Sequence, residues 1–96
     1  MNIGKAIREL RKQQGLSQEE LASKSGITQA ALSAIESKGV RPNSENLKSI
    51  CAALQVSESL VYVMGMEKSD VPENKQDLYD QLFPFIEDLV KRIGGQ

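Results

Sequence analysis

Two helix start signals lie close together near the N-terminus, with a glycine between them, and they limit the possible folds more than any other feature. Ser17 and Glu20 have the S-x-x-E spacing of a capping box, in which the hydroxyl and the carboxylate each bind an otherwise unpaired backbone N–H. Gly26 can adopt the positive φ of a sharp turn, and Thr28 is a good N-cap for the next helix. The segment therefore predicts two short helices joined by a tight turn.

The other apolar residues in the first two thirds of the chain also recur at helical spacing, with short polar breaks between them. Gly15 is expected to end the first helix as a left-handed C-cap, and Asn43 or Ser44 is expected to cap the fourth. Nothing alternates with a period of two over a useful length, so the fold is predicted to be all-α, with five helices in one bundle. These helices are expected over about residues 3–14, 18–25, 29–37, 44–54 and 58–64.

The last third of the chain has a different composition. Residues 67–74 are polar, contain Pro72 and are predicted to be a linker. A helical extension over 75–94 follows, in which Pro84 either kinks the helix or starts a new one. We expect this extension to form a dimer contact or to pack back on the bundle. Its apolar residues, at spacings of three and four, are Leu78, Leu82, Phe85, Ile86, Leu89, Val90 and Ile93.

Length and composition exclude several classes of protein. With 96 residues, the chain has room for one small domain, expected at 1–66, and the appendage. It has no His, and its single cysteine, Cys51, lies on a helical apolar stripe and is expected in the core. There is therefore neither a zinc-ligand set nor a Cys–His pair, and we expect no enzyme, no metal and no cofactor. No apolar run suits a membrane span or a secretion signal, so a cytoplasmic protein without membrane contact is expected.

Charge divides the chain at the same boundary. The net charge of −1 is unusual for a protein that binds a polyanion, but residues 1–66 carry eight basic and six acidic side chains. Residues 67–96 carry four basic and seven acidic ones. The first segment is therefore the better candidate for a polyanionic partner, and the second for a protein partner or for solubility.

The two-helix segment resembles the phage-repressor-like helix-turn-helix regulators of the Cro/C1 or XRE type. The matching residues are Leu16 to Ala22, Gly26 to Gln29, Ile35 with Glu36, and Pro42, within a resemblance that covers roughly residues 3–64. It implies a five-helix domain, a third helix that reads the major groove of double-stranded DNA, and homodimers on two-fold operators. The sequence departs from the family in one place, because its glycine follows Glu36 by three residues and not by two.

Four residues on the third helix are the candidates for reading bases. The Gln29 amide can both donate and accept a hydrogen bond, which matches adenine in the major groove, although it can also be an idle surface residue. Ala30 and Ala34 are small enough to contact thymine methyl groups, or they simply favour helix. Ser33 can reach a base edge or a phosphate.

Five further residues are the candidates for phosphate contacts. Gln18 begins the second helix, where free backbone N–H groups and the helix dipole favour an anion. Thr28 can contact phosphate or only cap its helix. The resemblance places the loop that holds Lys38, Arg41 and Asn43 along the phosphate backbone, where contacts position a protein without reading sequence. A solvated surface is the alternative for Gln18 and for the three loop residues.

The resemblance also implies a structural ion pair between Arg11 on the first helix and Glu36 at the end of the third. Taken together, these features predict a sequence-specific DNA-binding transcriptional regulator, a repressor that binds its operator as a homodimer. The alternative is an antitoxin-like or partner-regulating module, whose C-terminal helix binds another protein and whose DNA binding is secondary.

Overall fold

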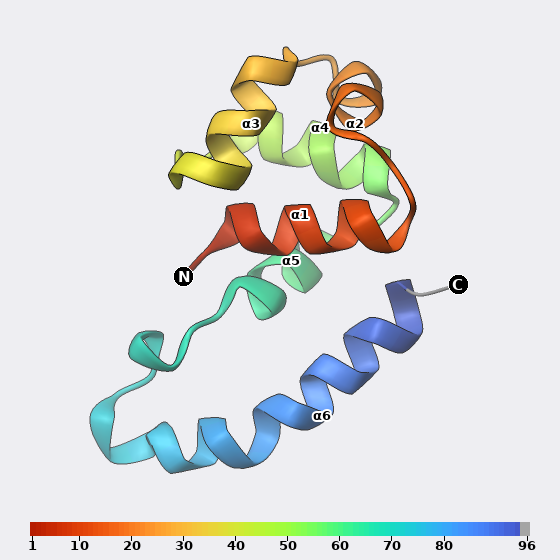
Figure 1. Cartoon of the computed structure of the whole chain (residues 1–96). Helices are drawn as coiled ribbons and strands as arrows, with labels where there is room; N and C mark the ends of the chain where they lie inside the picture. Colours follow the sequence, from red (N-terminus) through yellow and green to blue (C-terminus); the bar gives the residue numbers. More distant parts are fainter. Residues whose placement is uncertain (95–96) are drawn as a thin grey trace.

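A computed structural model describes residues 1–94 of the chain, apart from the side chains of Ile93 and Gly94. The place predicted for Ile93 on the C-terminal apolar stripe therefore lies outside the described residues. Within residues 1–94 all regular elements are helical, which confirms the predicted all-α fold of five helices and a C-terminal extension (Figure 1). The elements are α1 (Ile3–Gln13), α2 (Gln18–Ser25), α3 (Gln29–Lys38), α4 (Ser44–Leu54), α5 (Glu58–Gly65), the 3-10 turns η1 (Lys68–Asp70) and η2 (Glu73–Lys75), and α6 (Gln76–Gly94).

Local side-chain chemistry starts each of the first five helices. Each N-cap accepts a hydrogen bond from a backbone N–H in the first turn, a contact worth about 1 kcal/mol. The predicted capping box is present, since the Ser17 N–H donates to Glu20 Oε1 at 2.9 Å and the Glu20 N–H donates to Ser17 Oγ at 3.0 Å. The N-cap of α4 is Asn43, which settles the choice between Asn43 and Ser44. The five N-caps are Asn2, Ser17, Thr28, Asn43 and Ser57.

The core lies among α1 to α5, and aliphatic side chains make up almost all of it. Cys51 is buried there, as the helical stripe predicted. Small residues allow the helices to approach closely: a Cβ added to Gly4 would collide with the carbonyl oxygen of Ile35, where α1 crosses α3. The buried cluster consists of Ile3, Ala6, Ile7, Leu10, Leu21, Ala22, Leu32, Ile35, Leu47, Ile50, Cys51, Leu54 and Val61.

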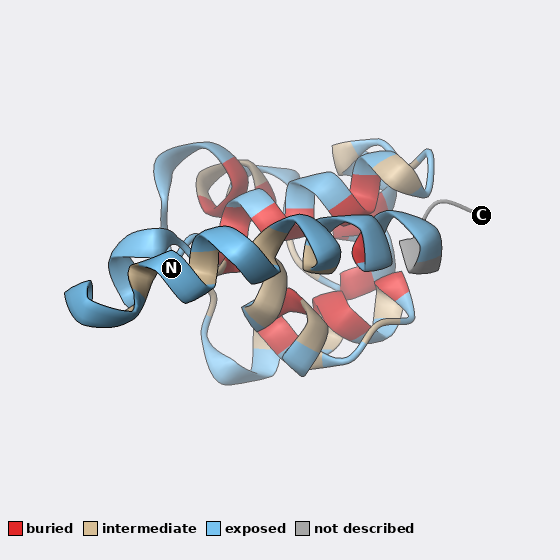
Figure 2. Cartoon of the chain, turned by 90° about the horizontal axis from the view of Figure 1, so that it is seen from below, coloured by how far each residue is buried: buried red, intermediate tan, exposed pale blue. Residues whose placement is uncertain are grey.

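Helix α6 lies across the bundle against α1 and α5, on the other side of α1 from α3 (Figure 1). One face of it packs inward, with Val90 buried and with Tyr79 stacked on Phe83 at 4.8 Å between ring centroids. Pro84 lies inside one continuous helix, and Figure 1 shows the direction of α6 changing partway along it. The view from below shows most of α6 as exposed (Figure 2).

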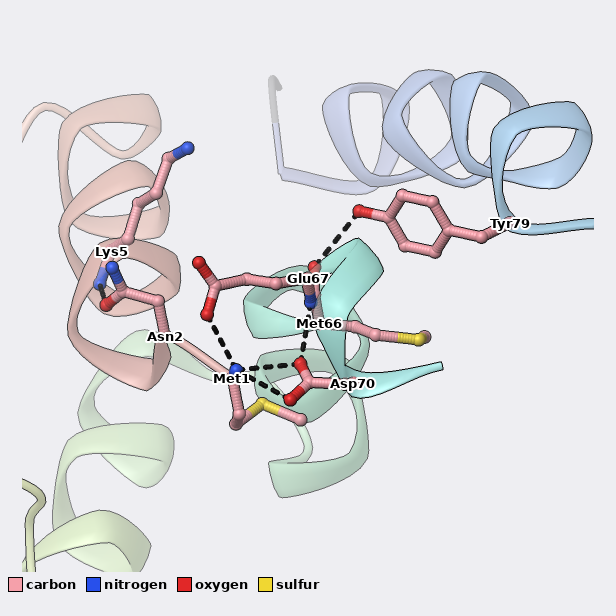
Figure 3. A network of polar contacts seen from close by, with 7 residues as sticks. All are labelled: Met1, Asn2, Lys5, Met66, Glu67, Asp70 and Tyr79. Atoms are coloured by element: carbon pink, nitrogen blue, oxygen red, sulfur yellow. Dashed lines mark hydrogen bonds and ion pairs between the residues drawn. The ribbon is translucent and has the colours of Figure 1, made fainter. Parts of the chain in front are cut away.

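Polar contacts fix the segment between α5 and α6, the predicted linker. The amino group of Met1 lies between Glu67 Oε1 and Asp70 Oδ2, at 2.7 Å from each (Figure 3). Lys68 forms an ion pair with Asp80 of α6 at 2.8 Å. We call these contacts the N-terminal clamp. They join the start of α1 to the connection that leads into α6, so the polar segment has a defined course.

In the described part of the chain, no single helix is both long and apolar enough to cross a membrane; α4 and α5 pass that test only as a pair bent by 99°.

Candidate nucleic-acid interface

Helices α2 and α3 form the two-helix unit that the start signals predicted. Gly26 ends α2 with φ 72°, a left-handed conformation that most other residues avoid. The N–H of Ile27 then donates to the Ala22 carbonyl at 3.1 Å, and Thr28 caps α3. Leu32 and Ile35 are buried on one side of α3, so the opposite side of this helix is left free of the bundle.

The four predicted base-reading residues all lie on α3. Gln29 and Ala30 are exposed in its first turn, whereas Ser33 and Ala34 are half-buried one turn later. Gln29 and Ser33 are four residues apart, as are Ala30 and Ala34, so the four form two adjacent rows on the helix surface. The structure therefore brings these residues together on one face, with Gln29 and Ala30 the more accessible.

The predicted phosphate-contacting residues lie in three different settings. Gln18 is half-buried, and its side chain donates to Glu36 Oε1 at 3.2 Å, an engagement inside the protein that the sequence analysis missed. Thr28 and Asn43 are exposed, and their side-chain oxygens act as N-caps at 3.0 Å and 2.8 Å. Lys38 and Arg41 are exposed on either side of Gly39, and within residues 1–94 neither pairs with a carboxylate.

The ion pair implied by the resemblance is present and holds α1 against α3. Arg11 donates from Nε to Glu36 Oε2 and from Nη2 to Glu36 Oε1, both at 2.9 Å. Its Nη1 donates to the Leu16 carbonyl at 2.8 Å, in the connection before α2. The Glu36 side chain is 1% exposed and that of Arg11 is 10% exposed. A bidentate, charge-assisted pair of this kind fixes both position and orientation.

Together with Gln18, this pair forms a network that joins three helices behind the free face of α3. Nothing in the sequence around Gln18 predicted its contact with Glu36. Gln14 is a second case, since its side chain donates to the Leu54 carbonyl at 2.7 Å and so binds the end of α4. Both contacts span long sequence separations, which local patterns do not record.

The capping box adds negative charge beside the start of α2. The Ser17 backbone N–H and then its hydroxyl lower the pKa of the Glu20 carboxyl, so this group stays ionised. Lys24 lies one turn further on and is exposed. The described residues contain no cluster of three or more His, Cys, Asp or Glu placed to hold a metal ion.

Comparison with known proteins agrees with this geometry. The sequence matches the family described as "Helix-turn-helix" over residues 7–61, which is more than half of the chain. It is also similar to the HTH-type transcriptional regulators PuuR of Escherichia coli (strain K12) and of Shigella flexneri, with 38% identity to each over 80 residues. Those matches cover 80% of this chain but only 43% of each relative, so the chain spans less than half of their length. The chain therefore belongs to the helix-turn-helix family of DNA-binding transcriptional regulators, of the Cro/C1 or XRE type.

Proposed function

We propose that this protein is a repressor that binds a two-fold operator as a homodimer, with α3 in the major groove of each half-site. The exposed face of α3, which begins with Gln29 and Ala30, carries this proposal because the rest of the helix is fixed to the bundle. A recognition helix contacts base edges mainly through its N-terminal residues. In this proposal the protein represses by occupying a promoter, and it acts in the cytoplasm, where its DNA target lies.

Within this proposal, Gln29 reads an adenine, and Ala30, Ser33 and Ala34 complete the contact with the bases. Lys38 and Arg41 bind phosphate in this proposal. Thr28 and Asn43 also contact the DNA backbone through the polar atoms that their capping bonds leave available, which is supported by their exposure. For Gln18 we propose a contact through its backbone N–H at the start of α2, since its side chain is engaged with Glu36.

The experiment that tests base reading is selection of bound sites from a random duplex library, with wild-type protein and the Gln29→Ala variant. A bidentate amide contact is worth about 1–3 kcal/mol of discrimination, so the variant should lose roughly 5- to 150-fold preference at one base pair per half-site. Gln81→Ala is the matched control, because Gln81 is an exposed glutamine on α6. Failure of the folded wild type to enrich any sequence would sink the proposal.

Binding should also depend only weakly on salt. Each phosphate contact by Lys or Arg releases about one counterion, and this interface has few such residues. Replacing Lys38 or Arg41 by alanine should weaken binding to all sequences alike and lower the salt slope by about one per contact. A steep loss of wild-type binding with modest salt would contradict this set of contacts.

The second candidate function is a protein-interaction module of the antitoxin-like kind, in which α6 binds another polypeptide. The observation that favours it is the large apolar surface that α6 exposes. A pull-down with the full chain separates the two functions, since the repressor retains only copies of itself and duplex DNA.

A further inference from the structure

Helix α6 carries two apolar stripes, and only one of them is used within the chain. The inner stripe, formed by Tyr79, Phe83, Ile86 and Val90, packs toward α1 and α5. The outer stripe, formed by Leu78, Leu82, Phe85 and Leu89, faces water, with exposed fractions of 51%, 57%, 74% and 56%. The sequence had suggested that α6 either packs on the bundle or forms an interface, but its two faces allow it to do both.

We propose that the outer stripe is the surface through which two copies of this chain pair, with their α6 helices antiparallel. This inference rests on the proposed function, which requires a homodimer, and it names the interface. The spacings along the outer stripe are four, three and four, the a/d pattern of a coiled-coil seam. The pattern reads the same in both directions, so an antiparallel pair sets Leu78 against Leu89 and Leu82 against Phe85 of the second copy.

The area of the outer stripe suits a dimer. Aromatic side chains such as Phe85 bury roughly 150–250 Å² each, and the three leucines of the stripe are smaller. More than half of each is exposed, so the stripe offers about 400–500 Å² per copy and about 800–1,000 Å² per pair, at the lower end of the range for a biological interface. Contiguous apolar patches of several hundred Å² on a small protein usually mark an interaction site.

A groove beside the stripe supports a second copy as the occupant. It lies between α6 and the segment that precedes it, with Met66 and Val71 on one wall and Leu78 and Leu82 on the other. Its lining is almost wholly apolar and its volume is about 230 Å³. A cavity of roughly 150 Å³ accepts benzene. In the antiparallel register, the phenyl ring of Phe85 from the second copy lies opposite Leu82, at the edge of this groove.

The distribution of charge along α6 favours the antiparallel direction. Its first half carries Asp77 and Asp80 and no basic residue, whereas the second half carries Glu87 and Asp88 beside Lys91 and Arg92 and has no net charge. Two of these groups are also engaged within the chain, Asp80 with Lys68 and Arg92 with Asp88. An antiparallel pair sets the acidic half of one helix beside the neutral half of the other, whereas a parallel pair sets the two acidic halves together. Because α1 lies between α6 and α3, pairing through the outer stripe leaves the predicted DNA-contacting residues uncovered (Figure 1).

The first test is the molar mass of the chain in solution, by analytical ultracentrifugation over a range of concentrations. Wild-type protein should have twice the mass of the 10.6 kDa chain, and the Leu82→Glu/Phe85→Glu variant should have the monomer mass. Glutamate and leucine favour helix about equally, so circular dichroism should show that α6 is kept. Tyr62→Glu is the control, because it places one such charge on an exposed aromatic residue of α5, away from the outer stripe, and should leave the dimer intact.

A monomeric wild type would overturn the inference, as would a stripe variant that still dimerises or a control that does not. These results are independent of DNA reading, because no DNA is present. If the interface is correct, the stripe variant should lose selection of a two-fold site but keep the base preference within one half-site. A wild-type protein that forms the dimer but selects no base sequence would instead contradict the proposed function.

Disulfide trapping tests the antiparallel register. Cys51 is buried, so single cysteines can be added at the surface. A mixture of Leu78→Cys and Leu89→Cys proteins should give a disulfide-linked heterodimer, and Leu78→Cys alone should give little linked product. Efficient linking of Leu78→Cys to itself would show a parallel pair and overturn the proposed register.

Discussion

Removing the positive charge of Arg11 should destabilise this fold far more than the loss of an exposed ion pair would. Glu36 is almost fully buried, and Arg11 supplies both of the charge-assisted bonds that compensate its carboxylate. Arg11→Met keeps a long apolar side chain but leaves that charge uncompensated, a change that costs about 3–5 kcal/mol. In a domain of this size, each kcal/mol lowers the Tm by about 4–8 °C, so a loss of at least about 12 °C is expected.

The assay is urea unfolding followed by circular dichroism, with Lys68→Met as the matched control. Lys68 and Asp80 also form a close ion pair, but their side chains are 49% and 56% exposed, so the control should lose less than about 1 kcal/mol. Adding Glu36→Gln to Arg11→Met removes the buried charge and should recover part of the loss. If Arg11→Met costs no more than the control, or if the double variant shows no coupling, the reasoning from burial is wrong.

Three other perturbations test separate parts of the structure, the first two by the same unfolding assay and the third by protease cleavage. Gly4→Ala should destabilise the fold by about 1–3 kcal/mol, because the new Cβ collides with the Ile35 carbonyl at the α1–α3 crossing; a gain in stability would contradict this. Ser25→Ala should be neutral or stabilise the fold by up to about 1 kcal/mol, because the buried Ser25 hydroxyl has no hydrogen-bond partner among the residues that the structure describes; a loss of stability of more than about 1 kcal/mol would contradict this. The N-terminal clamp should depend on pH. The hydrogen bonds that the Met1 amino group donates to Asp70 and Glu67 raise the pKa of that amino group, and the amino group, followed by the Glu67 backbone N–H, lowers the pKa of Asp70. Its contribution should therefore be complete between the unperturbed values of 3.8 and 8.0 and fall at lower and higher pH. In Asp70→Asn the fall at low pH should be lost, while the Met1–Glu67 pair remains; protease cleavage of residues 68–75 measures this.

The elements that the sequence predicted well are those that short-range chemistry determines. Ser17, Gly26 and Thr28 act on backbone groups within four residues of themselves, so their caps and turn can be read without knowing the rest of the fold. The end of α4 shows the limit of such signals. Gln55 has a left-handed conformation there, with φ 59°. Glutamine rarely adopts a positive φ, so the sequence did not predict this C-cap.

Contacts across long sequence separations could not be predicted in the same way. Spacing identified most apolar positions of α6 but not Tyr79 and Phe83 of the inner stripe, and which stripe is buried depends on where α1 and α5 lie. The contacts of Gln18 with Glu36 and of Met1 with Glu67 depend in the same manner on the packing of distant helices. For the candidate site, the sequence predicted which residues share the exposed face of α3. Of the network that fixes this helix, only the Arg11–Glu36 pair was expected, and that expectation came from the family resemblance.

The buried network and the exposed clamp divide the molecule into parts of unequal local stability. Behind α3, buried groups of α1, α2 and α3 bind one another. Helix α6 is held by its inner stripe, in which only Val90 is fully buried, and by the exposed and individually weak ion pair between Lys68 and Asp80. Pro84 also removes one backbone hydrogen bond inside α6. Segments with few buried contacts open with lower free energy than the core. Hydrogen exchange should therefore be faster in monomeric α6 than in α1, and Leu82→Glu/Phe85→Glu protein provides that monomer. Equal protection of the two helices in this variant would show that α6 is an integral part of the core.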